Sequence, residues 1–366
     1  MNLKSITFMR FPLLLLLILP YVADAQTVIP FNSPRWKVKG KATPYEELHL
    51  GKPALRLQEG RLLLEDANFK NGIIEFDIAL APDRYFPAIA FRMQDENNYE
   101  QYYVRPHQSG NPDAMQYTPV YNDLPSWQLY HGPGYSNAAL LPVDRWLHIK
   151  LVILGDQGEV YFDQDTTPVL FIRHLKREAA SGMIELNNMA PAPAWYRNFA
   201  YIATDDVTIK SKATPPPPLP ASVLSSWGIS NPFDEALLKD KVQLAATDTA
   251  KLSWKSLKAD DLGIVDLSVL SGAVTKKNTV FARVTIQADV PGVKKLSFGF
   301  SDRARVYLNN QLLYAGEDNF LSRDYRFLGT IGYFDAVYLN LKKGPNELWI
   351  AVSENFGGWG IKAKLE

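Results

Sequence analysis

The chain of 366 residues contains no cysteine, which excludes disulfides, thiol catalysis, cysteine-ligated zinc and iron–sulfur clusters. Exported eukaryotic domains often carry disulfides, so their absence favours a bacterial protein if the chain is exported. An excess of either charge is also lacking, because 39 Lys and Arg balance 39 Asp and Glu and no basic cluster stands out. We therefore do not expect nucleic acid or an anionic membrane surface as a partner.

Long hydrophobic runs are scarce, and the one at Phe11–Leu19 is about half the ~20 residues that a membrane-spanning helix needs. Lys4 and Arg10 lie before this run, and Ala23-Asp24-Ala25 follows it with the small-x-small pattern that signal peptidase accepts. This order predicts a signal peptide over residues 1–25 that is cleaved after Ala25. We expect a secreted or periplasmic protein that is not membrane-spanning.

Familiar catalytic motifs are missing as well. The sequence has no G-x-S-x-G elbow, no H-E-x-x-H helix and no phosphate-binding Gly-rich loop. None of the five histidines has a close metal-ligand spacing to another. His148 alternates with apolar residues in a strand-like run, so we interpret it as structural.

Aromatic residues, in contrast, are concentrated between Tyr99 and Tyr135. Seven tyrosines, one tryptophan, two histidines and one arginine lie there among Gly, Pro, Asn and Asp. Flat aromatic faces beside planar hydrogen-bonding groups suit a pyranose, which has an apolar C–H face and an equatorial rim of hydroxyls. Ligand pockets in general combine aromatic walls with a few placed polar groups. The segment therefore indicates glycan binding, with an oligo- or polysaccharide as the expected partner.

Prolines mark a boundary between two domains. The run Pro215–Pro220 favours an extended, semi-rigid spacer, so residues 213–222 are predicted to link a first domain over 27–212 to a second over 223–366. Both halves contain many short runs that alternate apolar and polar residues, such as Gly72–Leu80, and no segment keeps a helical period. We expect an all-β protein of two antiparallel β-sandwich (jelly-roll) domains joined by a proline-rich linker.

Strand alternation predicts which polar residues share a face. If the start of the aromatic segment is a strand, Gln101, Tyr103 and Arg105 point to one side. The apolar side of the preceding strand most simply faces the core, which sets Arg92 on the same polar face. We expect this face to bind a glycan, with His107–Tyr135 as its roof. The expected ligand-binding residues are Arg92, Gln101, Tyr103, Arg105, His107, Tyr117, Trp127 and Tyr130.

In this hypothesis the two arginines donate paired hydrogen bonds to hydroxyls or to a uronate carboxylate, and a tyrosine or Trp127 stacks on a sugar ring. The alternative is a self-packed surface loop whose rings fill a small core of their own. His107 and His131 could bind a ligand, act as acid or base, or have a plain loop role.

Strand-like runs in the first domain follow one another in a characteristic order. They are Asn71–Ile78, Ile89–Arg92, Asn98–Arg105, Asp144–Leu151 and Gly158–Asp163. This series resembles the concanavalin A-like lectin/glucanase superfamily, and more narrowly its laminin-G-like members. The resemblance implies a two-sheet jelly roll with a concave face that often holds glycans, in lectins, adhesion modules and glycosidases alike. Related sandwiches often hold Ca²⁺ in Asp-containing loops, so Asp163-Gln164-Asp165 leaves structural calcium open; no other cofactor is expected.

Three runs in the second domain also form a recognisable set. Phe300–Asn310 reads as a strand and hairpin, Leu339–Ile350 as a second hairpin, and Gly358–Ile361 as a closing strand. Together they resemble the galactose-binding-like jelly roll, which occurs as an accessory domain of glycosidases. The resemblance implies a sandwich that supports or binds glycans, and the role of this domain stays open.

The glucanases of the first superfamily test the enzymatic alternative. Their strand pattern Glu-x-Asp-x-x-Glu supplies a nucleophile and an acid/base. Glu75 and Asp77 fit the first two positions, but the third falls at Leu80, so the second catalytic Glu is missing. We interpret the two carboxylates as the polar face of a half-buried strand. If the protein is an enzyme, the candidate catalytic residues are Glu75, Asp77, His107 and His131.

Three functions therefore remain in view. The preferred one is an exported carbohydrate-binding protein that recognises a glycan on the polar face and aromatic segment of the first sandwich. The second is a glycoside hydrolase that lacks the usual glucanase motif. The third is a cell-envelope adhesion or structural module, whose protein partners the sequence does not identify.

Overall fold

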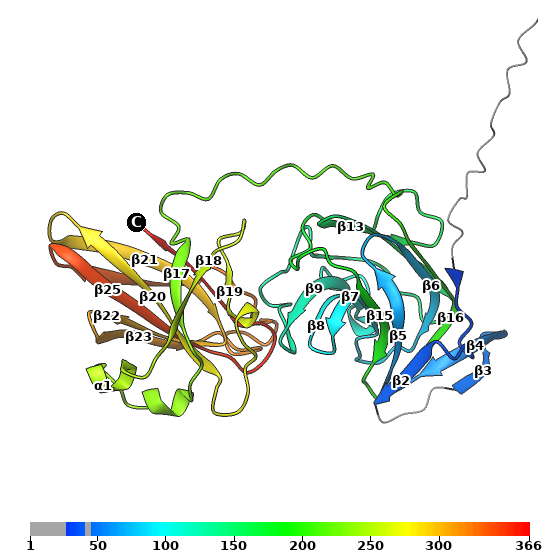
Figure 1. The fold of residues 1–366 in the computed structure, drawn as a ribbon, viewed down its shortest axis with the longest axis horizontal. Coiled ribbons are helices and arrows are strands. Elements are labelled where there is room, and N and C mark those ends of the chain that lie inside the picture. The colour runs from blue at the N-terminus through cyan, green and yellow to red at the C-terminus, as the bar shows by residue number, and fades with distance from the viewer. Residues whose placement is uncertain (1–26, 41–44) are drawn as a thin grey trace, which may run out of the picture.

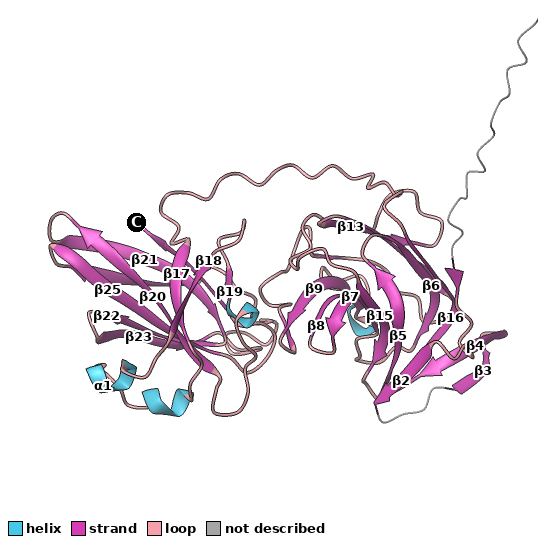
Figure 2. Ribbon diagram, in the orientation of Figure 1, coloured by secondary structure: helices cyan, strands magenta, loops and turns pink. Residues whose placement is uncertain are grey.

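The computed structural model describes residues 27–40 and 45–366, so the predicted signal peptide lies outside the described residues. These residues form two β-sandwiches that follow one another along the chain (Figure 1). Figure 2 shows that strands dominate both halves and that the helices are short. The predicted all-β class with antiparallel sandwiches is confirmed. None of the helices in the described ranges has the length and apolar character to cross a bilayer.

The first sandwich consists of two antiparallel sheets. One has the order β14 (Leu170–Ile172), β13 (Gln157–Phe162), β12 (Leu147–Leu154), β6 (Gly72–Leu80), β16 (Ala194–Ala203), β4 (Lys52–Leu57) and β3 (Tyr45–His49), with β1 (Thr27–Val28) beside β16. The other has the order β10 (Leu124–Pro125), β9 (Met115–Tyr121), β8 (Asn98–Val104), β7 (Ala88–Asp95), β15 (Gly182–Asn188), β5 (Gly60–Phe69) and β2 (Trp36–Gly40), with β11 (Ser136–Asn137) beside β9. A 3-10 helix, η1 (Pro106–Gln108), follows β8.

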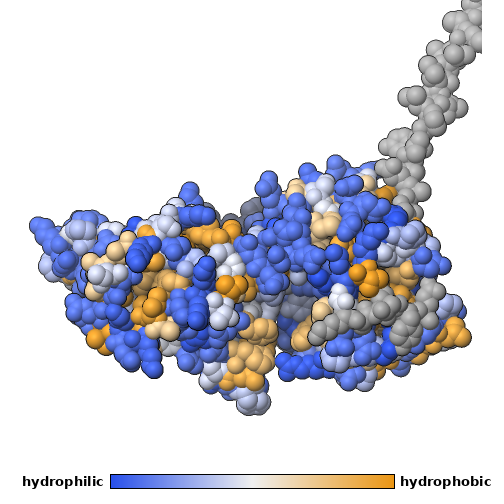
Figure 3. Space-filling model, turned by 60° about the horizontal axis from the view of Figure 1, so that its bottom comes forward, coloured by the Kyte–Doolittle hydropathy of each residue, from blue (hydrophilic) through white to orange (hydrophobic). Residues whose placement is uncertain are grey.

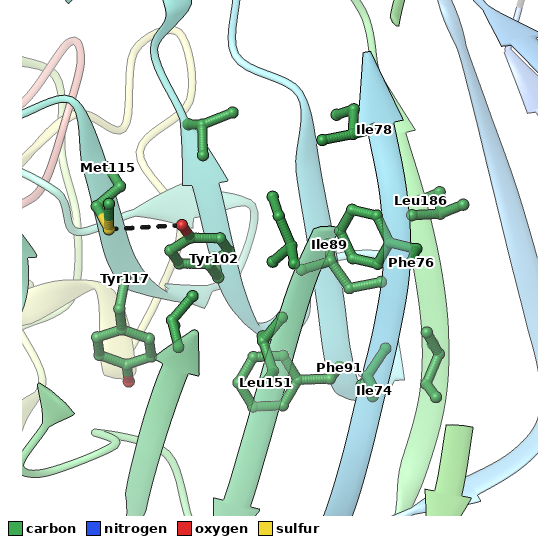
Figure 4. Close-up of a cluster of buried hydrophobic side chains, with 14 of the residues drawn as sticks. Ile74, Phe76, Ile78, Ile89, Phe91, Tyr102, Met115, Tyr117, Leu151 and Leu186 are labelled. Carbon is green, nitrogen blue, oxygen red and sulfur yellow. Dashed lines mark hydrogen bonds between the residues drawn. The ribbon is translucent and has the colours of Figure 1, made fainter. Parts of the chain in front are cut away.

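The core of this sandwich lies between the two sheets and follows strand alternation. On β6, Ile74, Phe76 and Ile78 are buried, while Glu75 and Asp77 are only half-buried on the outer face. Figure 4 shows these apolar side chains meeting those of β7, β8, β12 and β15. Fully burying one such side chain contributes about 1.5–3 kcal/mol, so the two sheets are held together mainly by this layer.

The second sandwich also pairs two antiparallel sheets. The larger has the order β18 (Trp254–Lys258), β17 (Ser226–Ser230), β20 (Thr279–Ala288), β25 (Gly344–Ser353), β22 (Arg303–Leu308) and β23 (Gln311–Glu317). The smaller has the order β19 (Val265–Asp266), β26 (Gly360–Leu365), β21 (Gly292–Ser301) and β24 (Asp335–Leu341). Its helices are the single-turn elements η2 (Glu235–Leu238), α1 (Ala246–Thr249) and η3 (Leu267–Val269).

The segment 204–225 joins the sandwiches without a strand or helix and runs as an extended arc (Figure 1). Near its start, the Glu159 carboxylate accepts hydrogen bonds from the backbone N–H groups of Lys210 and Ser211 at 3.1 and 2.6 Å. The prolines of the run lie in this arc, away from the surface where the sandwiches meet.

Gln128 docks the first sandwich directly onto the second. Its side chain is fully buried, and its Nε2 donates to the Leu328 carbonyl at 2.8 Å while its Oε1 accepts from the Ser301 hydroxyl at 2.9 Å. Its backbone N–H donates to the Gly357 carbonyl, and its carbonyl accepts from the Ile331 N–H, both at 2.9 Å. A single residue of the aromatic segment therefore joins three separate parts of the second sandwich.

Charged and hydroxyl groups reinforce this docking. The Lys176 ammonium, whose side chain is 4% exposed, contacts Asp260 at 2.9 Å and Asp261 at 2.6 Å. The Ser126 hydroxyl donates to the buried Asp266 carboxylate at 2.8 Å. Buried charges that are paired in this way are costly to separate, because each would then lack its partner. Direct contact, rather than the linker, therefore sets the separation of the sandwiches.

Candidate functional site

A cavity of about 270 Å³ lies where the two sandwiches meet. One wall is the outer face of β8 and β9 with the loops beside it, and the opposite wall is formed by loops of the second sandwich. Figure 3 shows hydrophobic surface near the junction of the two halves, whereas much of the remaining surface is hydrophilic. The cavity is lined by Arg84, Phe86, Gln101, Tyr103, Arg105, His107, Gln108, Asp113, Thr118, Pro125 and Trp127, and by Phe320, Leu328 and Phe356 of the second sandwich.

Strand pairing builds the floor of the cavity. β8 pairs with β9 so that Gln101 lies opposite Thr118 and Tyr103 lies opposite Gln116. These side chains point away from the core, as alternation predicts. The Tyr103 hydroxyl donates to Gln116 Oε1 at 2.9 Å, and Gln116 Nε2 donates to the Trp127 carbonyl at 2.8 Å. The floor and the Trp127 backbone are therefore held in place by protein groups alone.

Arg105 is the most firmly held cation of the cavity. Its Nη1 donates to the Asp113 backbone carbonyl at 2.7 Å, and its Nη2 donates to the Tyr103 hydroxyl at 2.6 Å and to Gln116 Oε1 at 2.7 Å. Its guanidinium lies 4.7 Å from the Tyr103 ring centroid and 5.8 Å from that of Trp127. These hydrogen bonds use at most three of the five guanidinium N–H groups, so others remain for a ligand.

His107 supplies a neutral imidazole. It lies in η1, with its ring centroid 5.5 Å from that of Phe86, and its Nδ1 is buried without a hydrogen-bond partner. Burial lowers the pKa of His107, and the positive charges of Arg84 and Arg105 lower it further. A neutral imidazole both donates and accepts a hydrogen bond, which suits a hydroxyl group.

Aromatic rings from both sandwiches meet at the mouth of the cavity. Trp127 and Phe356 contact edge to face, with ring centroids 5.7 Å apart. Phe86 lies 6.3 Å from Tyr103 in the same manner. Phe86 is 43% exposed and Phe356 is 57% exposed, so part of each side chain is open to solvent. These two rings are therefore free to take part in stacking.

The structure brings five of the eight expected ligand-binding residues to this cavity: Gln101, Tyr103, Arg105, His107 and Trp127. Arg92 lies elsewhere, so the expectation that it shares their face does not hold. Its φ of 51° belongs to a β-bulge that shifts the pairing of β7 with β8. Arg92 is 1% exposed and donates to the Lys70 and Gly155 carbonyls at 2.6 and 2.7 Å.

The two other expected residues, Tyr117 and Tyr130, belong to the core and not to the cavity. Figure 4 shows Tyr117 in the layer between the sheets, and its hydroxyl donates to the buried Glu100 carboxylate at 2.6 Å. Tyr130 is 3% exposed and packs against Tyr135 at 5.5 Å. The aromatic segment is therefore divided between core, cavity and docking surface, and it is neither a pure roof nor a self-packed loop.

The candidate catalytic residues lie in three different places. His107 lines the cavity, whereas His131 belongs to the docking surface, where its Nε2 lies 3.3 Å from the Ile331 carbonyl. Glu75 and Asp77 lie on the outer face of the other sheet, where the Asp77 carboxylate meets His148 Nδ1 at 2.8 Å. This hydrogen bond raises the pKa of His148 despite partial burial. Glu75 and Asp77 therefore form a surface polar network with His148, apart from the cavity.

Asp163 and Asp165 lie beside this network, where Asp163 pairs with Arg145 at 2.9 Å. Within residues 27–40 and 45–366, no group of three or more His, Asp or Glu side chains is arranged to hold a metal ion. Bound calcium therefore stays a prediction without an identified ligand set.

Sequence reasoning did not find the lining residues Arg84, Phe86, Phe320, Leu328 and Phe356. Arg84-Tyr85-Phe86 carries a usable signal, because a basic residue and two aromatic residues follow the end of a strand. The second-sandwich residues carry none, since only the docking of the two domains brings them to the cavity.

No protein-family model matches the chain, and no curated protein matches it. Among solved structures, the chain is similar to the carbohydrate-binding module CBM66 from Bacillus subtilis at 20% identity, covering 46% of this chain and 95% of that one with a TM-score of 0.35. A galectin-like protein of unknown function from Bacillus subtilis has 14% identity, coverage of 46% and 89%, and a TM-score of 0.34. The β-glucanase of Bacillus licheniformis has 11% identity, coverage of 49% and 98%, and a TM-score of 0.34. These neighbours agree with the lectin/glucanase resemblance, and at such scores they carry no further argument.

Proposed function

We propose that the protein binds a carbohydrate in the cavity between its two sandwiches. The observation that carries this proposal is the gathering of Trp127, Arg105, His107 and Gln101 around one space. An aromatic wall beside a few fixed polar groups is the usual composition of a small-molecule site. The sequence pattern also predicts each of these four residues as ligand-binding.

The size of the cavity limits what enters it. Its volume of about 270 Å³ is just below the range of roughly 300–1,000 Å³ typical of ligand pockets. One sugar ring fills such a space, and the rest of a chain would extend into solvent. The ring would stack on Trp127, while Gln101, Arg105 and His107 hydrogen-bond to its hydroxyls.

The lining favours binding over hydrolysis. Glycosidases of the common kinds use two carboxyl groups that flank the scissile bond. Among the described residues that line the cavity, Asp113 is the one carboxylate, and Glu75 and Asp77 lie on the opposite sheet. We therefore place recognition, not catalysis, in this cavity, and we propose that it acts outside the cytoplasm, as the predicted signal peptide implies.

A polysaccharide panel tests the proposal. Purified residues 26–366 are scored for retention on immobilised glycans and for released sugar in the same wells. We expect retention without release, and loss of retention in Trp127→Ala. Trp195→Ala is the matched control, because Trp195 lies half-buried on the outer face of the other sheet. Equal loss in both variants, or release of product, would overturn the proposal.

A further inference from the structure

Arg84 is a cation of the cavity without a protein anion to neutralise it. It lies in the loop between β6 and β7 and is exposed at the cavity mouth. Its guanidinium is 5.9 Å from the ring centroid of Phe320, which belongs to the second sandwich. Within the described part of the chain it makes no ion pair and no hydrogen bond. All five of its N–H donors are therefore free for a ligand.

The remaining lining does not compensate this charge. Arg105 contacts Asp113 through the backbone carbonyl and not through the carboxylate. Asp113 is the one lining carboxylate among the described residues, so two guanidinium groups face a single negative charge. Burial lowers the pKa of His107, the charges of Arg84 and Arg105 lower it further, and Asp113 raises it by less, in agreement with an excess of positive charge in the cavity. A neutral ligand would leave this excess positive charge unmatched.

An aromatic ring of the second sandwich lies beside the Arg84 guanidinium. The Phe320 ring lies 5.9 Å from the guanidinium, and Trp127 and Phe356, which contact each other, belong to the same lining. A guanidinium beside an aromatic ring can stack on it and still keep its N–H groups for a ligand. A planar guanidinium matches a planar carboxylate through two parallel hydrogen bonds better than it matches single hydroxyls.

We infer that the ligand of this cavity is an acidic sugar, a uronic acid residue whose carboxylate pairs with Arg84 while its ring lies against Trp127. This inference rests on the proposed function, since it names the class of sugar that the same cavity takes. Arg84 is then the specificity-determining residue. The role expected of Arg92 from the sequence passes to a residue eight positions earlier, because Arg92 is buried in the bulge.

Matched oligosaccharides test the inference. The full mature chain is titrated with uronate oligomers and with the neutral oligomers that carry CH2OH in place of the carboxylate. The third ligand is the sulfate ester of those neutral oligomers, which is anionic but has no carboxylate. We expect the uronate form to bind about tenfold more tightly than the neutral form, with a preference that shrinks as salt is raised. Arg84→Gln should abolish the preference, because it lowers the affinity for the uronate form much more than the affinity for the neutral form.

Two further variants keep the test specific. Arg84→Lys retains the charge without the planar fork and should keep only part of the preference. Arg145→Gln removes an exposed arginine on the other side of the first sandwich and should have no effect. Equal binding of neutral and uronate oligomers overturns this inference and leaves the proposed function standing. Preference for the sulfated form overturns the uronate assignment. Binding of none of the three overturns the inference and the proposed function together.

Discussion

Gln128→Ala should loosen the contact between the sandwiches. The substitution removes the side-chain hydrogen bonds to Leu328 and Ser301, and it leaves a partly buried carbonyl and a buried hydroxyl without those partners. A lost hydrogen bond that leaves a buried group unsatisfied costs about 1–3 kcal/mol. The backbone hydrogen bonds to Gly357 and Ile331 stay. We therefore expect docking to weaken by roughly 2–4 kcal/mol.

Gln94→Ala is a close control for this change. The Gln94 side chain also makes two hydrogen bonds, both donated to backbone carbonyls, those of Arg92 and Ser181, at 3.0 Å. It is exposed, so water replaces the lost bonds, and we expect a change within about 0.5 kcal/mol. The two substitutions remove the same atoms in different surroundings.

Denaturant unfolding followed by tryptophan fluorescence, together with native-state hydrogen exchange, would measure the difference. For Gln128→Ala we expect faster exchange at the backbone N–H groups of residue 128 and Ile331, which donate across the contact, and an unfolding transition that separates into two steps. Ligand affinity should fall too, because Phe320, Leu328 and Phe356 form one wall of the cavity. If Gln128→Ala is no less stable than Gln94→Ala and exchange is unchanged, the reasoning about docking is wrong.

Three other substitutions probe the same parts of the structure. Burial raises the pKa of Asp266 to about 6, so the folded protein binds this proton more tightly than the unfolded chain does, and the stability contributed by this group falls as pH rises from about 4 to 6. The free energy of unfolding of Asp266→Asn should therefore rise by roughly 2–3 kcal/mol relative to the parent over that range. A constant difference between the two proteins in chemical unfolding from pH 4 to 7 would contradict this. Gly357→Ala should destabilise the protein by about 1–3 kcal/mol in thermal unfolding, because the φ of Gly357 is 103° and a Cβ would meet the Gln128 side chain at 2.4 Å. Gly51→Ala is the control, because Gly51 also has a positive φ but open space around it. A change no larger than that of Gly51→Ala would argue against the close contact. Tyr103→Phe removes the hydroxyl that contacts Arg105 and should weaken sugar binding several-fold in calorimetry with little loss of stability, whereas unchanged affinity would show that the orientation of Arg105 is set without it.

Alternation alone predicted the faces of regular strands correctly. On β6, Phe76 faces the core and Asp77 faces outward, as a period of two requires. On β8, the adjacent tyrosines Tyr102 and Tyr103 separate into core and cavity for the same reason. Where the backbone is regular, the sequence pattern therefore gives the direction of each side chain.

The prediction failed where the backbone leaves this regularity. The positive φ at Arg92 is unusual for a residue with a long side chain, and no local pattern announces it. The same bulge moves Met93 away from the core cluster of Phe91 and into a separate one with Ala90 and Tyr99. A one-residue shift exchanges the two faces of a strand, so one bulge changes every later assignment.

The second wall of the cavity was beyond sequence reasoning for a different reason. Phe320 and Leu328 come from the loop between β23 and β24, and Phe356 comes from the loop between β25 and β26. They reach the cavity only because Gln128 and Lys176 dock the two sandwiches. Contacts between domains depend on complementary surfaces, which have no periodic signature in either domain. The first sandwich could therefore be predicted in outline, and the composite character of the site could not.

The linker over 204–225 gains a kinetic meaning from the direct docking of the sandwiches. A short tether keeps a released partner at an effective concentration in the millimolar range, so a domain that detaches rebinds its own partner before it diffuses away. A protease that cuts this exposed arc would leave the complex intact at first. Dilution would then separate the halves, since rebinding would have become bimolecular, and each half would leave with only one wall of the cavity.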